Sequence, residues 1–263
     1  MPYEFHLDPK KKWEQQYLAT KYHILPFLKE VISLSDLSNV LEIGCGEGGV
    51  LKAFCDEGYT CYGVDIASHR IESARHILSD DVRAKRVTFY AADVHDTETF
   101  AHLMGQVDLL ILKDAIEHIY QQEKILQVLH QFVRPGGHVF IAFPPWWNPF
   151  GGHQQVAQSF LRFVPWFHVF PRALYQKILQ TCGEPEAKVN GLLEVYDTRL
   201  PVRKFESLLH CTDWPVLKRQ FFLFNPIYEY KFGLKGRRQF ELVSGIPLLR
   251  DFLSTAVYYV LQG

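Results

Sequence analysis

The chain has 263 residues, 48% of them hydrophobic and 22% charged, and its formal net charge is −1. This hydrophobic content is enough for one large core, and the balanced charge excludes the basic surface that nucleic-acid binding requires. Five scattered cysteines without a C-x-x-C pair predict reduced thiols in a cytoplasmic protein. No histidines stand at metal-ligand spacing and no apolar run reaches about 18 residues, so we expect neither a metal site nor a membrane-spanning helix.

The N-terminal segment, residues 1–37, predicts a helical cap. Its opening, "MPYEFHLDPKKKWEQQY", is charged and lacks the apolar stretch of a signal peptide. Because the segment precedes the first predicted strand, we expect it to lie over a bound cofactor, with Tyr17 and Tyr22 within reach.

Residues 38–143 alternate between strands and helices. Apolar, β-branched runs predict strands at 38–44, 60–66, 86–94, 107–114 and 137–143, and apolar residues at helical spacing predict helices at 48–58, 68–80 and 121–133. This alternation predicts βαβ units and therefore a mostly parallel, doubly wound α/β sheet. Ligands of such sheets bind at the carboxyl ends of the strands, so the chemistry is expected there.

The first strand end, "EIGCGEGG" at 42–49, predicts a glycine turn. Glycines let the backbone turn tightly and approach a ligand closely. Gly44, Gly46 and Gly49 satisfy the pattern G-x-G-x-x-G. Asp65 ends the second predicted strand, where an acid holds ribose hydroxyls. These features also fit a nicotinamide or flavin dinucleotide site.

Two further acids favour a cationic ligand. Glu42 lies beside the glycine turn, where its carboxylate would repel a pyrophosphate and attract a positive charge. Asp93 ends the third predicted strand, where it can accept a hydrogen bond from an exocyclic amine such as that of adenine. A ribose, an adenine amine and a positive charge together describe S-adenosylmethionine. An NAD(P)-dependent oxidoreductase remains an alternative.

The segments "VLEIGCGEGG", "GVDI", "AADV", "VDLLILKDAIEHI" and "VRPGGHVFIAF" follow one another over residues 38–143. In this order and spacing they resemble the motifs of class I S-adenosylmethionine-dependent methyltransferases, in particular the small-molecule (type 11/23-like) branch with an "EH" after the fourth strand. The resemblance implies a Rossmann-like, seven-stranded sheet whose last strand is antiparallel, and S-adenosyl-L-methionine as the cofactor.

The resemblance also implies roles for individual residues. It places Glu42, Gly44, Cys45 and Gly46 at the methionine end of the cofactor, Asp65 and Ile66 at the ribose and adenine, Asp93 and Val94 at the adenine edge, and Lys113 beside the cofactor. Lys113 departs from the family pattern, which often has a smaller or apolar residue at this position.

The second half of the chain completes the predicted sheet. We expect a helix at 171–183, a sixth strand at 186–193 and the final strand at 254–262. Residues 144–170 and 194–253 remain as substrate-side insertions of one domain that spans 1–263. The second insertion is aromatic and basic around 221–238, which fits a solvated loop or a weak contact with an anionic substrate group or membrane surface.

The stretch "FPPWWNPFGGHQQ", residues 143–155, predicts a roof over the active site, because it leaves directly from a strand end and is rich in aromatic residues. Gly151 and Gly152 predict a bend or hinge. His153 is the first candidate for a catalytic base and His118 the second. The alternatives are a flap that packs on the sheet with a structural His153, and a His118 that only shapes the pocket floor.

Together these features predict a methyltransferase for a small, apolar or aromatic acceptor. The methyl group would move by in-line displacement, accelerated mainly by holding both reactants in one dry pocket. A non-catalytic scaffold that binds S-adenosylmethionine remains a second alternative.

Overall fold

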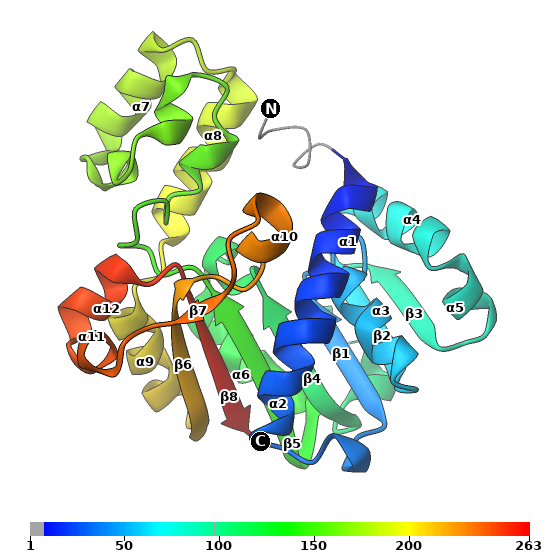
Figure 1. Ribbon diagram of the computed structural model, residues 1–263. Helices are drawn as coiled ribbons and strands as arrows, with labels where there is room; N and C mark the ends of the chain where they lie inside the picture. The colour runs from blue at the N-terminus through cyan, green and yellow to red at the C-terminus, as the bar shows by residue number, and fades with distance from the viewer. Residues whose placement is uncertain (1–7, 97) are drawn as a thin grey trace.

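The structure is a computed structural model that describes residues 8–96 and 98–263 (Figure 1). Its centre is an eight-stranded sheet with the order β3-β2-β1-β4-β5-β8-β6-β7. The strands are β1 (Asn39–Ile43), β2 (Thr60–Asp65), β3 (Val87–Ala91), β4 (Val107–Lys113), β5 (Val133–Phe143), β6 (Val216–Phe224), β7 (Arg237–Arg238) and β8 (Ala256–Gln262). The first five are parallel, and β8 runs antiparallel to both of its neighbours, β5 and β6.

The α-helices are α1 (Pro9–Ala19), α2 (Leu25–Lys29), α3 (Gly49–Asp56), α4 (Ser68–Ile77), α5 (Ser79–Arg83), α6 (Gln122–Phe132), α7 (Arg172–Thr181), α8 (Glu186–Thr198), α9 (Val202–Cys211), α10 (Tyr228–Phe232), α11 (Glu241–Gly245) and α12 (Pro247–Leu253). In the parts of the chain that the structure describes, no helix combines the length and apolar content that crossing a membrane requires.

Two hydrophobic cores lie on the two faces of the sheet. Consecutive residues of β4 alternate between them, because side chains of a strand point to opposite faces in turn. Leu109 and Ile111 pack in the core that contains α2, α3 and α4, whereas Leu110 and Leu112 pack in the core that contains α6 and α9. All residues of β4 are buried, as expected for a central strand covered on both sides.

A third, smaller core lies in a separate lobe formed by α7, α8 and the preceding turns. This lobe stands above the carboxyl ends of the parallel strands (Figure 1). Its core contains Leu161, Phe167, Tyr175, Leu179, Val189, Leu192 and Leu193. The lobe follows β5 directly, so the residues that enter and leave it pass over the strand ends.

The predicted sixth strand at 186–193 is wrong, because these residues form α8. The signal was helical: Val189, Leu192 and Leu193 are buried at the spacing of one helix face. The sixth strand of the sheet is instead β6, which lies inside the predicted second insertion. The predicted helix at 171–183 is present as α7, but it belongs to the lobe, and α9 packs on the sheet in its place.

The sheet has eight strands where seven were predicted. The additional strand is the two-residue β7, which pairs antiparallel with β6 at the edge of the sheet. The antiparallel last strand is confirmed, since β8 pairs antiparallel with both β5 and β6. The alternation of strands and helices predicted for 38–143 is confirmed as well.

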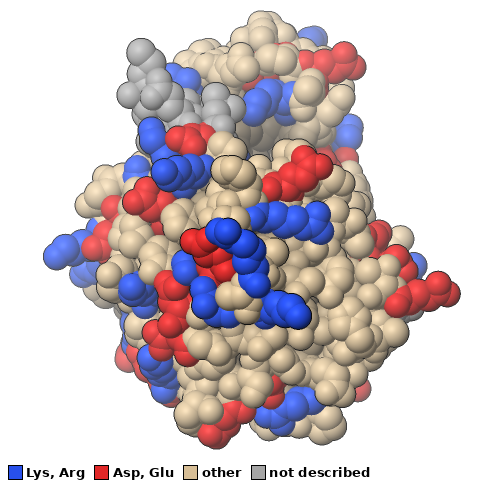
Figure 2. Space-filling model, turned by 90° about the vertical axis from the view of Figure 1, so that its right-hand side faces the viewer, with Lys and Arg blue, Asp and Glu red and all other residues tan. Residues whose placement is uncertain are grey.

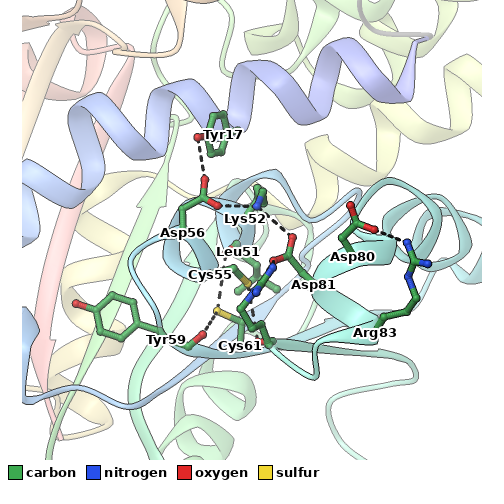
Figure 3. Close-up of polar contacts among 11 residues, drawn as sticks. Tyr17, Leu51, Lys52, Cys55, Asp56, Tyr59, Cys61, Asp80, Asp81 and Arg83 are labelled. Carbon is green, nitrogen blue, oxygen red and sulfur yellow. Dashed lines mark hydrogen bonds and ion pairs between the residues drawn. The ribbon is translucent and has the colours of Figure 1, made fainter.

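The N-terminal helices pack against α3 through a polar network (Figure 3). The Tyr17 hydroxyl donates to Asp56 at 2.9 Å, and Lys52 bridges Asp56 at 2.6 Å and Asp81 at 3.1 Å. On this side of the molecule acidic and basic side chains are interspersed among the described residues (Figure 2). The first seven residues of the predicted cap lie outside the described residues.

Candidate active site

A cavity of about 450 Å³ opens at the carboxyl ends of β1, β4 and β5. Its walls include the glycine turn after β1, helix α1, the end of β4 and the turn after it, the segment that follows β5, and helix α10. Of the predicted site residues, Glu42, Gly44, Cys45, Lys113 and His153 line this cavity. Segments far apart in the sequence therefore meet around one space.

The glycine turn has the left-handed backbone that its sequence predicts. Gly44, Gly46 and Gly48 have φ values of +75°, +51° and +78°, a region that favours glycine. Asp65 holds the turn in place, because its carboxylate accepts hydrogen bonds from the Gly46 and Ala67 amides at 2.9 Å each. The ends of β1 and β2 are thus joined by one buried acid.

Arg70, which the sequence analysis did not identify, lies across the glycine turn. Its guanidinium pairs with Glu47 at 2.9 Å and contacts Asp65 at 3.4 Å. A Cβ atom added to Gly46 would lie 2.0 Å from the Arg70 Nη2 atom, so glycine is needed for this approach. One feature of the sequence could have pointed to Arg70. It is a basic residue in the first turn of α4, where the helix dipole disfavours positive charge.

Three predicted residues lie at the neighbouring strand ends, β2 and β3. Ile66 is 76% exposed although it follows a buried strand. Asp93 accepts hydrogen bonds from the His95 amide at 2.9 Å and from the His95 ring, 2.8 Å away. Val94 is buried in the core beneath them. An exposed apolar side chain beside an acid is a suitable surface for a flat, polar-edged ring such as adenine.

The floor of the cavity contains buried charges. Burial raises the pKa of Glu42 well above its ordinary value, with the nearby Lys113 ammonium acting in the opposite direction. Lys113 is itself buried and pairs with Asp114 at 2.5 Å. Burial by itself would raise the pKa of Asp114, but the charge and hydrogen bond of Lys113, together with the charge of Lys231, hold that pKa below its ordinary value. Cys45 is buried, which raises its thiol pKa, so it fills space as an uncharged side chain.

Glu117, His118 and His153 form a cluster where the segments that follow β4 and β5 meet. Glu117 and His118 lie in the 3-10 turn Ile116–His118 after β4, and His153 comes from the segment after β5. The Nε2 atoms of both histidines lie 4.0 Å from Glu117 Oε1, and the two rings are 5.0 Å apart. Burial, followed by the neighbouring His118, lowers the pKa of His153 to about 3.

Comparison with known proteins agrees with this arrangement. Residues 12–183 match the family described as "Methyltransferase domain". The chain belongs to this family, the class I S-adenosylmethionine-dependent methyltransferases. The alternative of a nicotinamide-dependent oxidoreductase does not agree with this membership.

Among curated relatives, a ubiquinone biosynthesis O-methyltransferase of Pectobacterium carotovorum is 29% identical over 104 residues, 39% of this chain and 41% of the relative. The chain thus spans less than half the length of that relative. Solved structures with the same fold include phosphoethanolamine N-methyltransferase 2 of Haemonchus contortus with S-adenosyl-L-methionine (TM-score 0.57, 17% identity, covering 90% of this chain and 51% of that one). Another is geranyl diphosphate C-methyltransferase of Streptomyces coelicolor (TM-score 0.56, 15% identity, 90% and 77% covered).

The segment after β5 covers one side of the methyltransferase cavity, as its position predicted. Asn148, Phe150 and His153 line the cavity, whereas Trp146 is buried against the His168 ring at 4.6 Å. The two glycines do not form an open hinge. A Cβ atom on Gly151 would lie 2.2 Å from the Trp146 carbonyl oxygen, and one on Gly152 would lie 2.2 Å from His168 Cβ. Close packing therefore explains both glycines.

Helix α10 closes the opposite side of the cavity. Tyr228, Lys231 and Phe232 line it, so part of the aromatic and basic stretch in the second insertion faces the site. Burial lowers the pKa of Lys231 to about 8. Two other basic residues of this stretch have partners elsewhere: Arg238 pairs with Glu30 at 2.7 Å, and Arg237 lies over the Phe240 ring.

Replacing Asp65 by alanine should weaken S-adenosylmethionine binding by about 10- to 150-fold. The loss corresponds to charge-assisted hydrogen bonds of roughly 1.5–3 kcal/mol, and the turn that Asp65 holds through Gly46 would loosen as well. Isothermal titration calorimetry measures the effect. Asp80→Ala, which removes an exposed acid paired with Arg83 on α5, is the matched control. Unchanged affinity in a folded Asp65→Ala variant would remove Asp65 from the cofactor site.

Replacing Gly49 by alanine should lower stability and cofactor affinity together. The added Cβ would lie 2.3 Å from the backbone oxygen of Trp13, so α1 must move away from α3 and from the cavity it lines. Overpacking of this kind costs about 1–3 kcal/mol, which urea unfolding would show. Gly191→Ala is the control, because nothing lies within 4 Å of its Cβ position in α8 and alanine favours a helix. Equal stability of the two variants would contradict the contact.

Proposed function

We propose that this methyltransferase moves the methyl group of S-adenosylmethionine to a small, largely apolar acceptor. The observation that carries the proposal is that one cavity is lined both by Gly44 and Cys45 of the glycine turn and by His153 of the segment after β5. A donor held at the glycine turn and an acceptor held at the histidine end would share one space. Holding two reactants in line lowers the barrier without any further chemistry from the protein.

The charges of the cavity support a cationic donor at the glycine turn. S-adenosylmethionine carries a sulfonium and an ammonium, and a neighbouring carboxylate attracts both. Glu42 is buried there, and its Oε2 atom has no hydrogen-bond partner among the described residues. A bound ammonium would give this oxygen a donor, so we assign Glu42, Gly44, Cys45 and Gly46 to the methionine end. Asp65 and Ile66, then Asp93 and Val94, extend this path toward the adenosine.

The lining of the acceptor end supports an apolar or aromatic substrate. Phe150, Tyr228 and Phe232 contribute ring surface to the cavity. Such walls exclude water and bind flat apolar molecules. The polar groups of the cavity wall include His153 and Glu117, with His118 beside them. We therefore place the activation of the acceptor at these three residues.

Formation of S-adenosylhomocysteine from S-adenosylmethionine tests the proposal. A panel of phenols, alcohols, amines and acidic carbon compounds, each with and without an aromatic ring, would be supplied to the purified chain. We expect turnover with apolar or aromatic members of the panel and tight binding of S-adenosylmethionine. Binding without any turnover across the panel would favour the alternative of a non-catalytic scaffold.

We also propose a cytoplasmic location. All five cysteines are unpaired, and three of them, Cys45, Cys55 and Cys61, are buried. Free thiols persist where the redox conditions are reducing. Non-reducing mass analysis of the protein taken from its cells would show five free thiols if this is correct.

A further inference from the structure

Three side chains of the types that bind metal ions lie close together beside the cavity, although one of them is far from the other two in the sequence. Glu117, His118 and His153 each offer one ligand atom, and these three atoms lie within 4.8 Å of one another. Glu117 and His118 are adjacent in the turn after β4, whereas His153 reaches them from the segment after β5. Only the fold brings the third ligand to the other two.

The carboxylate of this cluster lacks a partner in the protein. Glu117 is 3% exposed, and no hydrogen-bond donor among the described residues reaches either Oε1 or Oε2. A buried carboxylate without donors is costly, and proteins normally offset that cost with a cation or hydrogen bonds. The two nearest groups, His118 and His153, stay at 4.0 Å, which is too far for hydrogen bonds.

The geometry fits a shared ion better than a proton relay. When a carboxylate assists a histidine that acts as a base, the carboxylate and the imidazole are hydrogen-bonded at about 2.6–3.2 Å. Here one carboxylate oxygen stands at the same 4.0 Å from two imidazoles. When ligand atoms lie about 2.1 Å from a common ion, they lie roughly 3.0–3.5 Å from one another. The three side chains would therefore have to move toward one another to bind an ion.

We propose that Glu117, His118 and His153 bind one divalent transition-metal cation, with open positions that face the cavity. Two imidazole nitrogens and one carboxylate oxygen suit Zn²⁺, Mn²⁺ or Fe²⁺, and three protein ligands leave room for a substrate atom. His153 lies on the cavity wall together with Glu117, so the open positions lead to the acceptor. The site therefore selects an acceptor that carries a hydroxyl group.

The catalytic role of the ion rests on the proposed methyl transfer, whereas the binding of the ion does not. A cation at this site would stabilise the oxygen anion of the acceptor and so promote loss of the hydroxyl proton to solvent. The oxygen lone pair then forms the bond to the methyl carbon, while the carbon–sulfur bond breaks and its electron pair stays on sulfur. The products are the methyl ether, S-adenosylhomocysteine and one proton.

Metal binding can be measured without cofactor or acceptor. The full chain is treated with EDTA, dialysed into metal-free buffer, and titrated with Mn²⁺ and with Zn²⁺ by calorimetry. We expect saturation at one ion per chain for at least one of these metals. Glu117→Gln and His153→Ala should each weaken this binding by more than tenfold. The matched controls are Glu186→Gln and His210→Ala, which change exposed residues of α8 and α9 and should bind as the wild type does.

The fold of each variant is checked by urea unfolding. Glu117→Gln is the informative variant, since it removes a buried unpaired carboxyl and should unfold at no lower urea concentration than the wild type. Absence of saturable Mn²⁺ and Zn²⁺ binding by the wild type would overturn the metal site, as would equal binding by the folded Glu117→Gln variant. Turnover by EDTA-treated enzyme would overturn the catalytic role of the ion while leaving the methyltransferase function intact. One-to-one binding without turnover of any acceptor would support the site and count against the proposed reaction.

Discussion

His153→Ala should lower methyl transfer about 10²–10⁴-fold, the range for loss of a group that removes the acceptor proton. His153 lines the cavity and lies 4.0 Å from the buried Glu117 carboxylate. The loss is expected whether the imidazole takes the proton itself or holds a cation that promotes its release. Affinity for S-adenosylmethionine should change little, because we assign the methionine end of the cofactor to Glu42 and the glycine turn and not to His153. Single-turnover formation of S-adenosylhomocysteine, together with calorimetry, separates the two effects.

The control for this variant is His210→Ala. This change removes an exposed histidine near the C-terminal end of α9. It should retain full turnover and full cofactor affinity. Added imidazole offers a second readout, since it can enter the space left by the side chain and restore part of the rate. Normal turnover by His153→Ala with a confirmed acceptor would make His153 a structural residue. A parallel loss of cofactor affinity would place it at the donor end instead.

Lys113→Met should lower the free energy of unfolding by about 3–5 kcal/mol, the usual result of removing one partner from a buried ion pair. Lys113 is buried and pairs with Asp114 at 2.5 Å, and its charge also acts on the buried Glu42. Without the ammonium, two carboxyl groups would remain near one another in the cavity floor. Urea unfolding at neutral pH measures the loss. Lys124→Met on the exposed face of α6 is the control and should be nearly neutral.

A double-mutant cycle tests the cause of this loss. The double variant Lys113→Met/Asp114→Asn should be less destabilised than the sum of the single changes, because neither charge is then left alone. The pH dependence has a defined sign. The pKa of Asp114 lies below its ordinary value of 3.8 in the folded protein. Its contribution is therefore present above about pH 3.8 and lost as the pH falls further, so wild type and Lys113→Met should converge in acid. Strict additivity would show that Lys113 stabilises the protein by packing alone.

Local patterns in the sequence determined the cofactor half of the molecule. The strands at 38–143 are short apolar runs that a buried parallel sheet requires, and the three positive-φ glycines of the turn after β1 occupy positions that only glycine adopts easily. Asp65 and Ile66 follow from the rule that ligands bind where parallel strands end. Each of these inferences needs only neighbouring residues, so each is visible in one stretch of sequence.

The second half shows where local patterns fail. Residues 186–193 were assigned to a strand, although Val189, Leu192 and Leu193 repeat at helical spacing and are buried on one face of α8. The real sixth strand, β6, has an irregular pattern of buried and exposed residues because it lies near the edge of the sheet and pairs with the short β7. The position of β6 in the sheet depends on its pairing with β8, and no short stretch of sequence reveals that pairing.

The cluster of Glu117, His118 and His153 was decided by tertiary structure alone. The sequence shows Glu117 beside His118, but no spacing rule connects them to His153. The three residues meet because β4 and β5 are adjacent and parallel, so the segments that leave their carboxyl ends emerge side by side. Arg70 over Gly46 and Lys231 in the cavity wall have the same origin: their positions depend on how α4 and α10 pack. Long-range contacts of this kind are fixed by the whole fold, whereas the glycine turn is fixed by its own residues.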